Sequence, residues 1–191
     1  LWHELVWQWK VEYLVTVTSA GHGTASVKSV WVETGKKAHV TVKADDGYAF
    51  GKWTGDVPAD HDKDPSLTFT VLDQAYDFTA SFLPIVYVNP EGDDTNDGKS
   101  PATAFQTIKK ALESDSPVCA LLADGTYEVT EQIVIDNGSI VAGATPGAKA
   151  VVKLMKKLPS AGAEGSVFKL AADAQLRNVT VTTDFDRGDS N

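Results

Sequence analysis

The chain has 191 residues, of which 17 are Lys or Arg and 26 are Asp or Glu, so its formal net charge at pH 7 is -9. This length suits one domain or two small ones, and a hydrophobic content of 42% is too high for a disordered chain. The acidic balance argues against nucleic acid as a partner, because few cations are available to neutralise phosphates. The longest apolar runs, such as Val118–Ala123, are too short for membrane insertion as a helix.

The single cysteine, Cys119, excludes an internal disulfide and a cysteine metal cluster. It lies inside an apolar run, so we expect a buried, small hydrophobic side chain rather than a nucleophile. The chain opens on Leu1 without an initiator Met or a signal peptide, and we interpret it as a piece of a longer protein.

Tryptophan and histidine are confined to the first third of the chain, at Trp2, Trp7, Trp9, Trp31 and Trp53 and at His3, His22, His39 and His61. A change of composition of this kind indicates two modules, and Pro84 lies near the step. We therefore expect an end strand of a preceding module, or a linker, over residues 1–12. A β module follows over 13–84, and a second module over 85–191.

The first module shows a period of two. Apolar and polar residues alternate over 13–18, 39–43, 67–71 and 78–82, with Gly-rich or Asp-rich turns between them. This pattern predicts half-buried antiparallel strands in a small all-β unit. Residues 1–12 also alternate, which indicates either the last strand of a preceding module or a strand added to this module's own edge.

The segment from Asp46 to Asp56, DGYAFGKWTGD, is the most specific part of the first module. With the turn at 21–23, the strand at 35–44 and the closing TASF at 79–82, it resembles the divergent B-repeat of bacterial surface proteins named after internalins. The resemblance implies a spacer or adhesion module of a secreted multidomain protein.

Two aromatic residues of that segment, Tyr48 and Trp53, are candidates for glycan binding, because exposed rings can stack on sugars. The alternative is that they supply buried area to a small core. The three tryptophans at positions 2, 7 and 9 form a second candidate surface for a glycan.

The second module reads as one helix followed by short strands. Thr103 and Gln106 have the spacing of a capping box, and the apolar residues after them predict an amphipathic helix over 103–114. Short apolar strands then recur at 118–122, 132–135, 139–142, 150–154, 166–170 and 176–182. No helix separates these strands, which excludes βαβ units and leaves a parallel solenoid of stacked coils.

The entry segment from Tyr87 to Leu112, with 118–127 after it, resembles the start of right-handed parallel β-helix proteins of the pectate-lyase-like superfamily. The fold class expected for the whole chain is therefore all-β. It joins a small antiparallel module to a truncated right-handed parallel β-helix, whose end is covered by an N-terminal capping α-helix. Two to three coils fit in the chain, so we expect further domains of the same or another chain to stack on the open end.

The loop DDTND at 93–97 is the candidate metal site, with Asp93, Asp94, Asn96 and Asp97 as possible calcium ligands. The alternative is a turn built from Asx hydrogen bonds. Lys149, Lys153, Lys156 and Lys157 form a basic run, which is either a solvated face or a site for an acidic polysaccharide.

No catalytic residue is assigned. After Pro84 there is no His, the only Arg are Arg177 and Arg187, and the acidic residues Asp124, Asp136, Asp173 and Asp184 are scattered. We expect a non-catalytic, extracellular or cell-surface bacterial segment that serves as spacer or scaffold, with adhesion or glycan contact. The alternative is the front of a polysaccharide lyase or glycoside hydrolase whose catalytic coils lie beyond Asn191.

Overall fold

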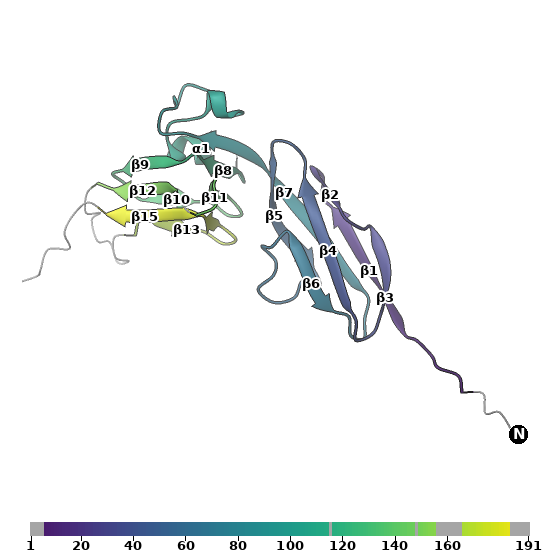
Figure 1. Cartoon of the computed structure of the whole chain (residues 1–191). Helices are drawn as coiled ribbons and strands as arrows, with labels where there is room; N and C mark the ends of the chain where they lie inside the picture. The colour runs from purple at the N-terminus through teal and green to yellow at the C-terminus, as the bar shows by residue number, and fades with distance from the viewer. Residues whose placement is uncertain (1–5, 115, 148, 156–165, 184–191) are drawn as a thin grey trace, which may run out of the picture. The chain divides into compact units, whose positions relative to one another are not determined.

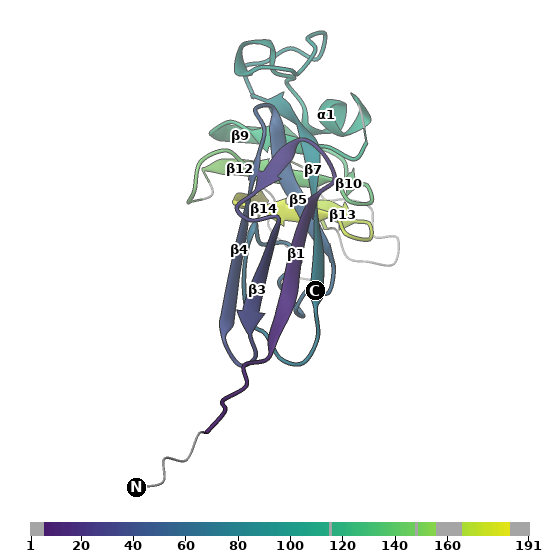
Figure 2. The same ribbon diagram turned by 90° about the vertical axis from the view of Figure 1, so that its right-hand side faces the viewer.

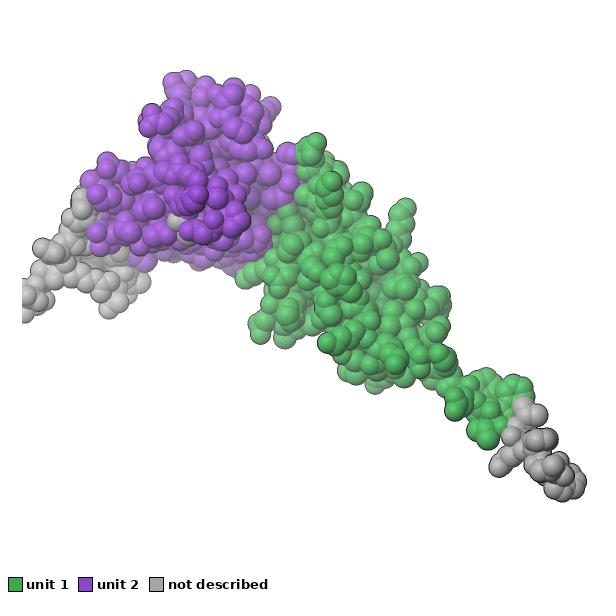
Figure 3. All heavy atoms as spheres, in the orientation of Figure 1, with its two compact units in different colours: residues 1–46, 50–82 green, residues 47–49, 83–191 purple. Residues whose placement is uncertain are grey.

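The computed structural model describes residues 6–114, 116–147, 149–155 and 166–183. It is mostly β, with 50% of the residues in strands and 6% in helices. Within the described residues no helix is long and apolar enough to span a membrane. The chain forms two compact units, one of residues 1–46 and 50–82 and the other of residues 47–49 and 83–191 (Figure 3).

The first unit is built from seven strands (Figure 1 and Figure 2). They are β1 (Glu12–Ser19), β2 (Gly23–Ala25), β3 (Ser29–Glu33), β4 (Lys37–Ala44), β5 (Tyr48–Gly55), β6 (Ser66–Thr70) and β7 (Tyr76–Val88), of which β5 and β7 also extend into the second unit. β1 pairs antiparallel with β3 and parallel with β7. β4 pairs antiparallel with β2 and β6. The strands predicted at 13–18, 39–43, 67–71 and 78–82 thus lie within β1, β4, β6 and β7, apart from one residue at the end of β6.

Alternate residues of these strands form the core of the first unit. Val15 and Val40 are fully buried, and Trp53 is 2% exposed. The Trp53 ring packs edge-on against Phe78 at a centroid distance of 6.2 Å, and its Nε1 donates a hydrogen bond to the Asp64 carbonyl at 2.7 Å. A period-two sequence therefore places one face of each strand inside, as the hydrophobic effect requires.

Residues 6–11 lie outside any strand, in contrast to the strand expected over 1–12, of which residues 1–5 are outside the described part. Within the described residues no strand pairs with this segment, so its alternation does not produce a ladder. Its C-terminal end contacts the first unit, where the Val11 carbonyl accepts the Thr34 N–H and Lys10 pairs with Glu33 at 3.3 Å.

Among its described residues, the second unit contains a 3₁₀ turn, η1 (Pro101–Thr103), one helix, α1 (Ile108–Ser114), and eight short strands after it. The strands are β8 (Cys119–Leu122), β9 (Gly125–Val129), β10 (Ile133–Ile135), β11 (Ile140–Gly143), β12 (Ala150–Leu154), β13 (Phe168–Leu170), β14 (Gln175–Arg177) and β15 (Val179–Thr183). They form three parallel sheets. β8, β11 and β14 pair in one, β9, β12 and β15 in the second, and β10 and β13 in the third.

The sheet of β8 and β11 is buried on both faces. Ala120, Leu122 and Val141 belong to the main apolar core of the unit. Cys119 and Ile140, which alternate with them, belong to a second apolar cluster that also contains Leu83. Burial on both faces explains why Val118–Ala123 is apolar without alternation.

The helix begins five residues later than expected. Phe105 does not enter a helix because its N–H donates to the Tyr87 carbonyl at 2.9 Å and its own carbonyl accepts the Asn89 N–H at 2.9 Å. The cap is Thr107, whose hydroxyl accepts the Lys110 N–H at 3.2 Å. The capping box expected for Thr103 is therefore wrong for α1, and Thr103 instead closes the 3₁₀ turn with Ser100.

We expect Ile108→Asp to destabilise the second unit by about 3–5 kcal/mol, because it places a carboxylate where the side chain is buried against the main core. Calorimetric unfolding, with hydrogen exchange to assign each transition to a unit, measures this. The exposed Glu113 on the same helix provides the control Glu113→Asp, which should leave both transitions in place. A loss confined to the first unit would contradict the assignment of Ile108 to this core.

Candidate functional site

The loop that precedes α1 is organised by the carboxylate of Asp94. Its Oδ1 accepts the N–H groups of Gln106 and Thr107, both at 2.9 Å, and its Oδ2 accepts the Thr107 hydroxyl at 2.8 Å. Three donors on one half-buried carboxylate fix the start of the helix relative to the loop twelve residues earlier. The first function of Asp94 in this structure is therefore structural.

The other candidate ligands are also hydrogen bonded within the loop. Asp93 accepts the N–H and hydroxyl of Thr95, both at 2.8 Å, and Asp97 accepts the Thr103 hydroxyl at 2.7 Å and the Lys99 N–H at 3.1 Å. Asn96 donates to the Ala104 carbonyl at 3.1 Å. The hydrogen bond from the Thr103 hydroxyl lowers the pKa of Asp97, and the hydrogen bonds from Thr95 lower that of Asp93.

Asp93 and Asp97 therefore form Asx turns within the loop, whereas Asp94 and Asn96 tie the loop to residues 104–107. Within the described residues no group of three or more His, Cys, Asp or Glu side chains is placed to hold a metal ion. Calcium binding by Asp93, Asp94, Asn96 and Asp97 stays a prediction from the sequence. Calorimetric titration with millimolar Ca²⁺ tests it, since heat that Asp97→Asn removes would support a site and the absence of heat would dismiss one.

The two aromatic candidates for glycan binding lie in different environments. Trp53 is in the core of the first unit, packed on Phe50 and Phe78, with no ring face open to a sugar. Tyr48 is half-exposed at the start of β5. The structure therefore does not bring the two rings together on one exposed face.

The tryptophans ahead of the first strand are exposed. Trp7 is 77% and Trp9 is 89% accessible to solvent, and Trp31 on β3 is also exposed. Trp2 lies outside the described residues. Exposed indole rings of this kind are available for contact with a glycan or another protein.

The acidic residues and the arginine singled out from the sequence lie on separate elements of the second unit. Asp124 and Asp136 are exposed near strand ends, and Arg177 donates from Nε to the Gln175 side chain at 2.9 Å. Burial raises the pKa of the Cys119 thiol to about 11, so it is protonated and inert at neutral pH. Lys149 is exposed and Lys153 half-exposed, whereas Asp184, Lys156, Lys157 and Arg187 lie outside the described part.

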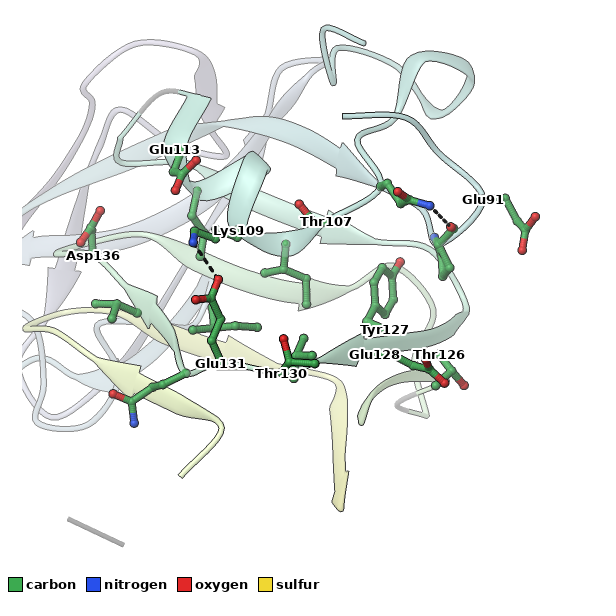
Figure 4. A pocket seen from close by; sticks show the side chains of 18 residues that line it. Glu91, Thr107, Lys109, Glu113, Thr126, Tyr127, Glu128, Thr130, Glu131 and Asp136 are labelled. Atoms are coloured by element: carbon green, nitrogen blue, oxygen red, sulfur yellow. Dashed lines mark hydrogen bonds and ion pairs between the residues drawn. The ribbon is translucent and has the colours of Figure 1, made fainter. Parts of the chain in front are cut away.

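The second unit carries a groove of about 890 Å³ between α1 and the strands β9 and β10 (Figure 4). One wall is formed by Pro90, Glu91, residues 106–109, Leu112 and Glu113, and the other by residues 126–134 and Asp136. Lys109 on α1 reaches across to Glu131, with Nζ 2.7 Å from the carboxylate. Sequence reasoning missed this groove because the strands expected at 118–122 and 132–135 left out residues 125–129, which form β9.

Removal of the Asp94 carboxylate should destabilise the second unit. We expect Asp94→Ala to cost roughly 2–3 kcal/mol, because two backbone N–H groups and one hydroxyl lose their acceptor. Chemical denaturation measures this loss. Asp93→Ala is the control, since it breaks bonds only to Thr95, and its effect should be smaller. Equal losses for both variants would contradict the central role of Asp94.

Comparison with known proteins gives one match. Searches of curated proteins and of solved structures found none. Residues 13–86, however, match the family model of the divergent InlB B-repeat domain. B-repeat domains occur in bacterial surface proteins. The match supports the B-repeat part of the resemblance and relates residues 13–86 to a type of module that is found in bacterial surface proteins.

Proposed function

We propose that this chain is a non-catalytic segment of a large secreted or surface-anchored bacterial protein, in which it acts as spacer and scaffold. The divergent B-repeat at 13–86 is the first structural module. The second unit is the cap and the first coils of a right-handed parallel β-helix, of the kind that the entry segment at 87–112 resembles. The occurrence of B-repeats in bacterial surface proteins supports a position outside the cell.

The observation that carries the proposal is the order of strands in the three parallel sheets. Along the chain β8, β9 and β10 are followed by β11, β12 and β13, and each strand pairs with its counterpart three strands later. β14 and β15 continue the same order. A chain that visits three sheets in turn and then stacks on itself has the connectivity of a solenoid, in which each coil contacts only its neighbours.

The position of α1 supports its assignment as the cap of this solenoid. Ile108, Ala111 and Leu112 face the main core with the apolar residues of the first coil. An amphipathic helix at this place keeps water from the apolar interior, which the first coil would otherwise expose.

Exposed apolar side chains at the opposite end of the stack support the proposal that further coils, or another protein, pack there. Ile135 in β10 is fully buried, whereas Leu170, its register partner in β13, is 47% exposed. Val152 in β12 is likewise buried and its partner Val181 in β15 is exposed. Another coil, from the same chain or a second one, would cover this column and pair with β13, β14 and β15.

An engineered cross-link tests the coil arrangement. Lys153 and Thr182 are register partners on neighbouring parallel strands, so Lys153→Cys with Thr182→Cys should form a disulfide on mild oxidation. Lys153→Cys with Thr183→Cys is the matched control, because successive residues of a strand point to opposite faces. Mass spectrometry of the digested protein should detect the first cross-link and not the second. The reverse result, or neither cross-link, would overturn the stacking of β12 on β15.

The second candidate function is the front part of a polysaccharide lyase or glycoside hydrolase, which the pectate-lyase-like resemblance favours. Incubation of the chain with acidic and neutral polysaccharides separates the two functions. The scaffold proposal predicts no new reducing ends and no unsaturated uronates, while binding without cleavage would add glycan contact to it. Release of either product would overturn it.

A further inference from the structure

We propose that the groove of the second unit binds an extended, basic peptide segment of a partner protein, which pairs with β9 as an added strand. The groove is the cavity between α1 and the strands β9 and β10 described above. The proposal stands on the pairing of β9 and on the groove's charge, and it does not depend on the spacer function.

One edge of β9 faces the groove. Five consecutive residues, 126–130, line it, although alternate side chains of a strand point to opposite faces. A cavity that touches every residue in succession lies along the strand's edge. The edge on the other side is occupied, since β9 pairs with β12 over its whole length.

The hydrogen-bond pattern identifies which backbone groups point into the groove. The Gly125 N–H donates to the Lys149 carbonyl at 3.2 Å, and the Val129 carbonyl accepts the Met155 N–H at 2.9 Å, both on the β12 side. In a parallel ladder successive residues direct their N–H and C=O groups to alternate sides. Thr126 and Glu128 therefore direct theirs to the groove, and within the described residues no strand pairs with them.

Strand β10 continues this edge around the corner. The Ile133 N–H and the Ile135 carbonyl are bonded on the β13 side, to Val167 and Ala171. Val134, between them, also lines the groove. An unpaired edge next to a cavity is the arrangement to which extended peptides add in β-augmentation.

Charge complementarity selects the occupant. Five carboxylates line the groove, from Glu91, Glu113, Glu128, Glu131 and Asp136, against one ammonium group, that of Lys109 (Figure 4). Lys109 is paired with Glu131 and does not offset the other four. The resulting negative potential favours a peptide with Lys or Arg at alternate positions and repels an acidic one. The volume of about 890 Å³ lies in the range of pockets that enclose a ligand.

The probe is the peptide Ac-(Thr-Lys)₃-NH₂, titrated into the full 191-residue chain with amide NMR shifts as the readout. We expect saturable shifts at Thr126 and Glu128. The acidic counterpart Ac-(Thr-Glu)₃-NH₂ should cause none.

Two methylated peptides separate strand pairing from charge attraction. One carries N-methyl groups on its three Thr amides and the other on its three Lys amides, so both keep the charge of the parent peptide. Because an added strand uses every second residue, one of them should bind about tenfold more weakly or worse while the other retains affinity. Equal affinity of all three peptides, or no binding of the parent, would overturn the proposal.

Variants of the chain provide the reciprocal test. Glu128→Pro removes the N–H that faces the groove, and proline is tolerated on open strand edges, so it should weaken binding about tenfold or more. Glu128→Gln, which keeps the N–H, should lose less, and Glu12→Gln on the first unit should lose nothing. Circular dichroism checks that the proline variant folds. If it does not, the two methylated peptides, titrated into the unmodified Ca²⁺-free protein, still test the strand pairing. If the chain alone forms a dimer and Glu128→Pro abolishes that dimer, the occupant of the groove is a second copy of the chain, and the peptide proposal is overturned.

Discussion

The parallel pairing of each strand with its counterpart one coil later is the constraint on which the second unit depends. A strand in a parallel sheet has two edges, and each interior strand of the stack fills both of them with a neighbouring coil. β11 lies between β8 and β14, and β12 lies between β9 and β15. At the ends of these sheets, β8 pairs in parallel with the C-terminal part of β7. Within the described residues, β9, β10, β13, β14 and β15 each have one edge that no strand pairs with. The groove beside β9 and the exposed side chains of Leu170 in β13 and Val181 in β15 lie at strands of this kind.

The loop before α1 is held in place by side-chain hydrogen bonds instead of by strand pairing. From Asn89 to Thr107 the chain has little regular structure, yet Asp93, Asp94, Asp97 and Ser100 each accept a hydrogen bond from a nearby backbone N–H. Polar residues are therefore abundant in this loop for a structural reason. The same composition gives the pattern of a calcium loop, because carboxylates that accept N–H groups and carboxylates that bind Ca²⁺ occur at similar spacing.

The strands could be predicted where the hydrophobic pattern is strong. Residues 150–154 coincide with β12, and the run at 176–182 overlaps β14 and β15, which Asn178 separates with a positive φ of 51°. The start of α1 could not be predicted, because Phe105 fits an amphipathic stripe but is held in a bridge to Val88 by residues distant in sequence. β9 was missed because Gly125 and Thr126 are typical of a turn. The groove was missed with it, because an unpaired strand edge exposes backbone groups and therefore produces no periodic pattern of side chains in the sequence.

Gly143 at the end of β11 limits how closely successive coils can approach. A Cβ atom there would lie 2.2 Å from the backbone carbonyl of Asn178, the corner residue of the next coil. The corners of the two coils are thus in direct backbone contact, with no side chain to act as a spacer. Any side chain at position 143 would have to push these two corners apart, so this position accepts only glycine unless the backbone shifts.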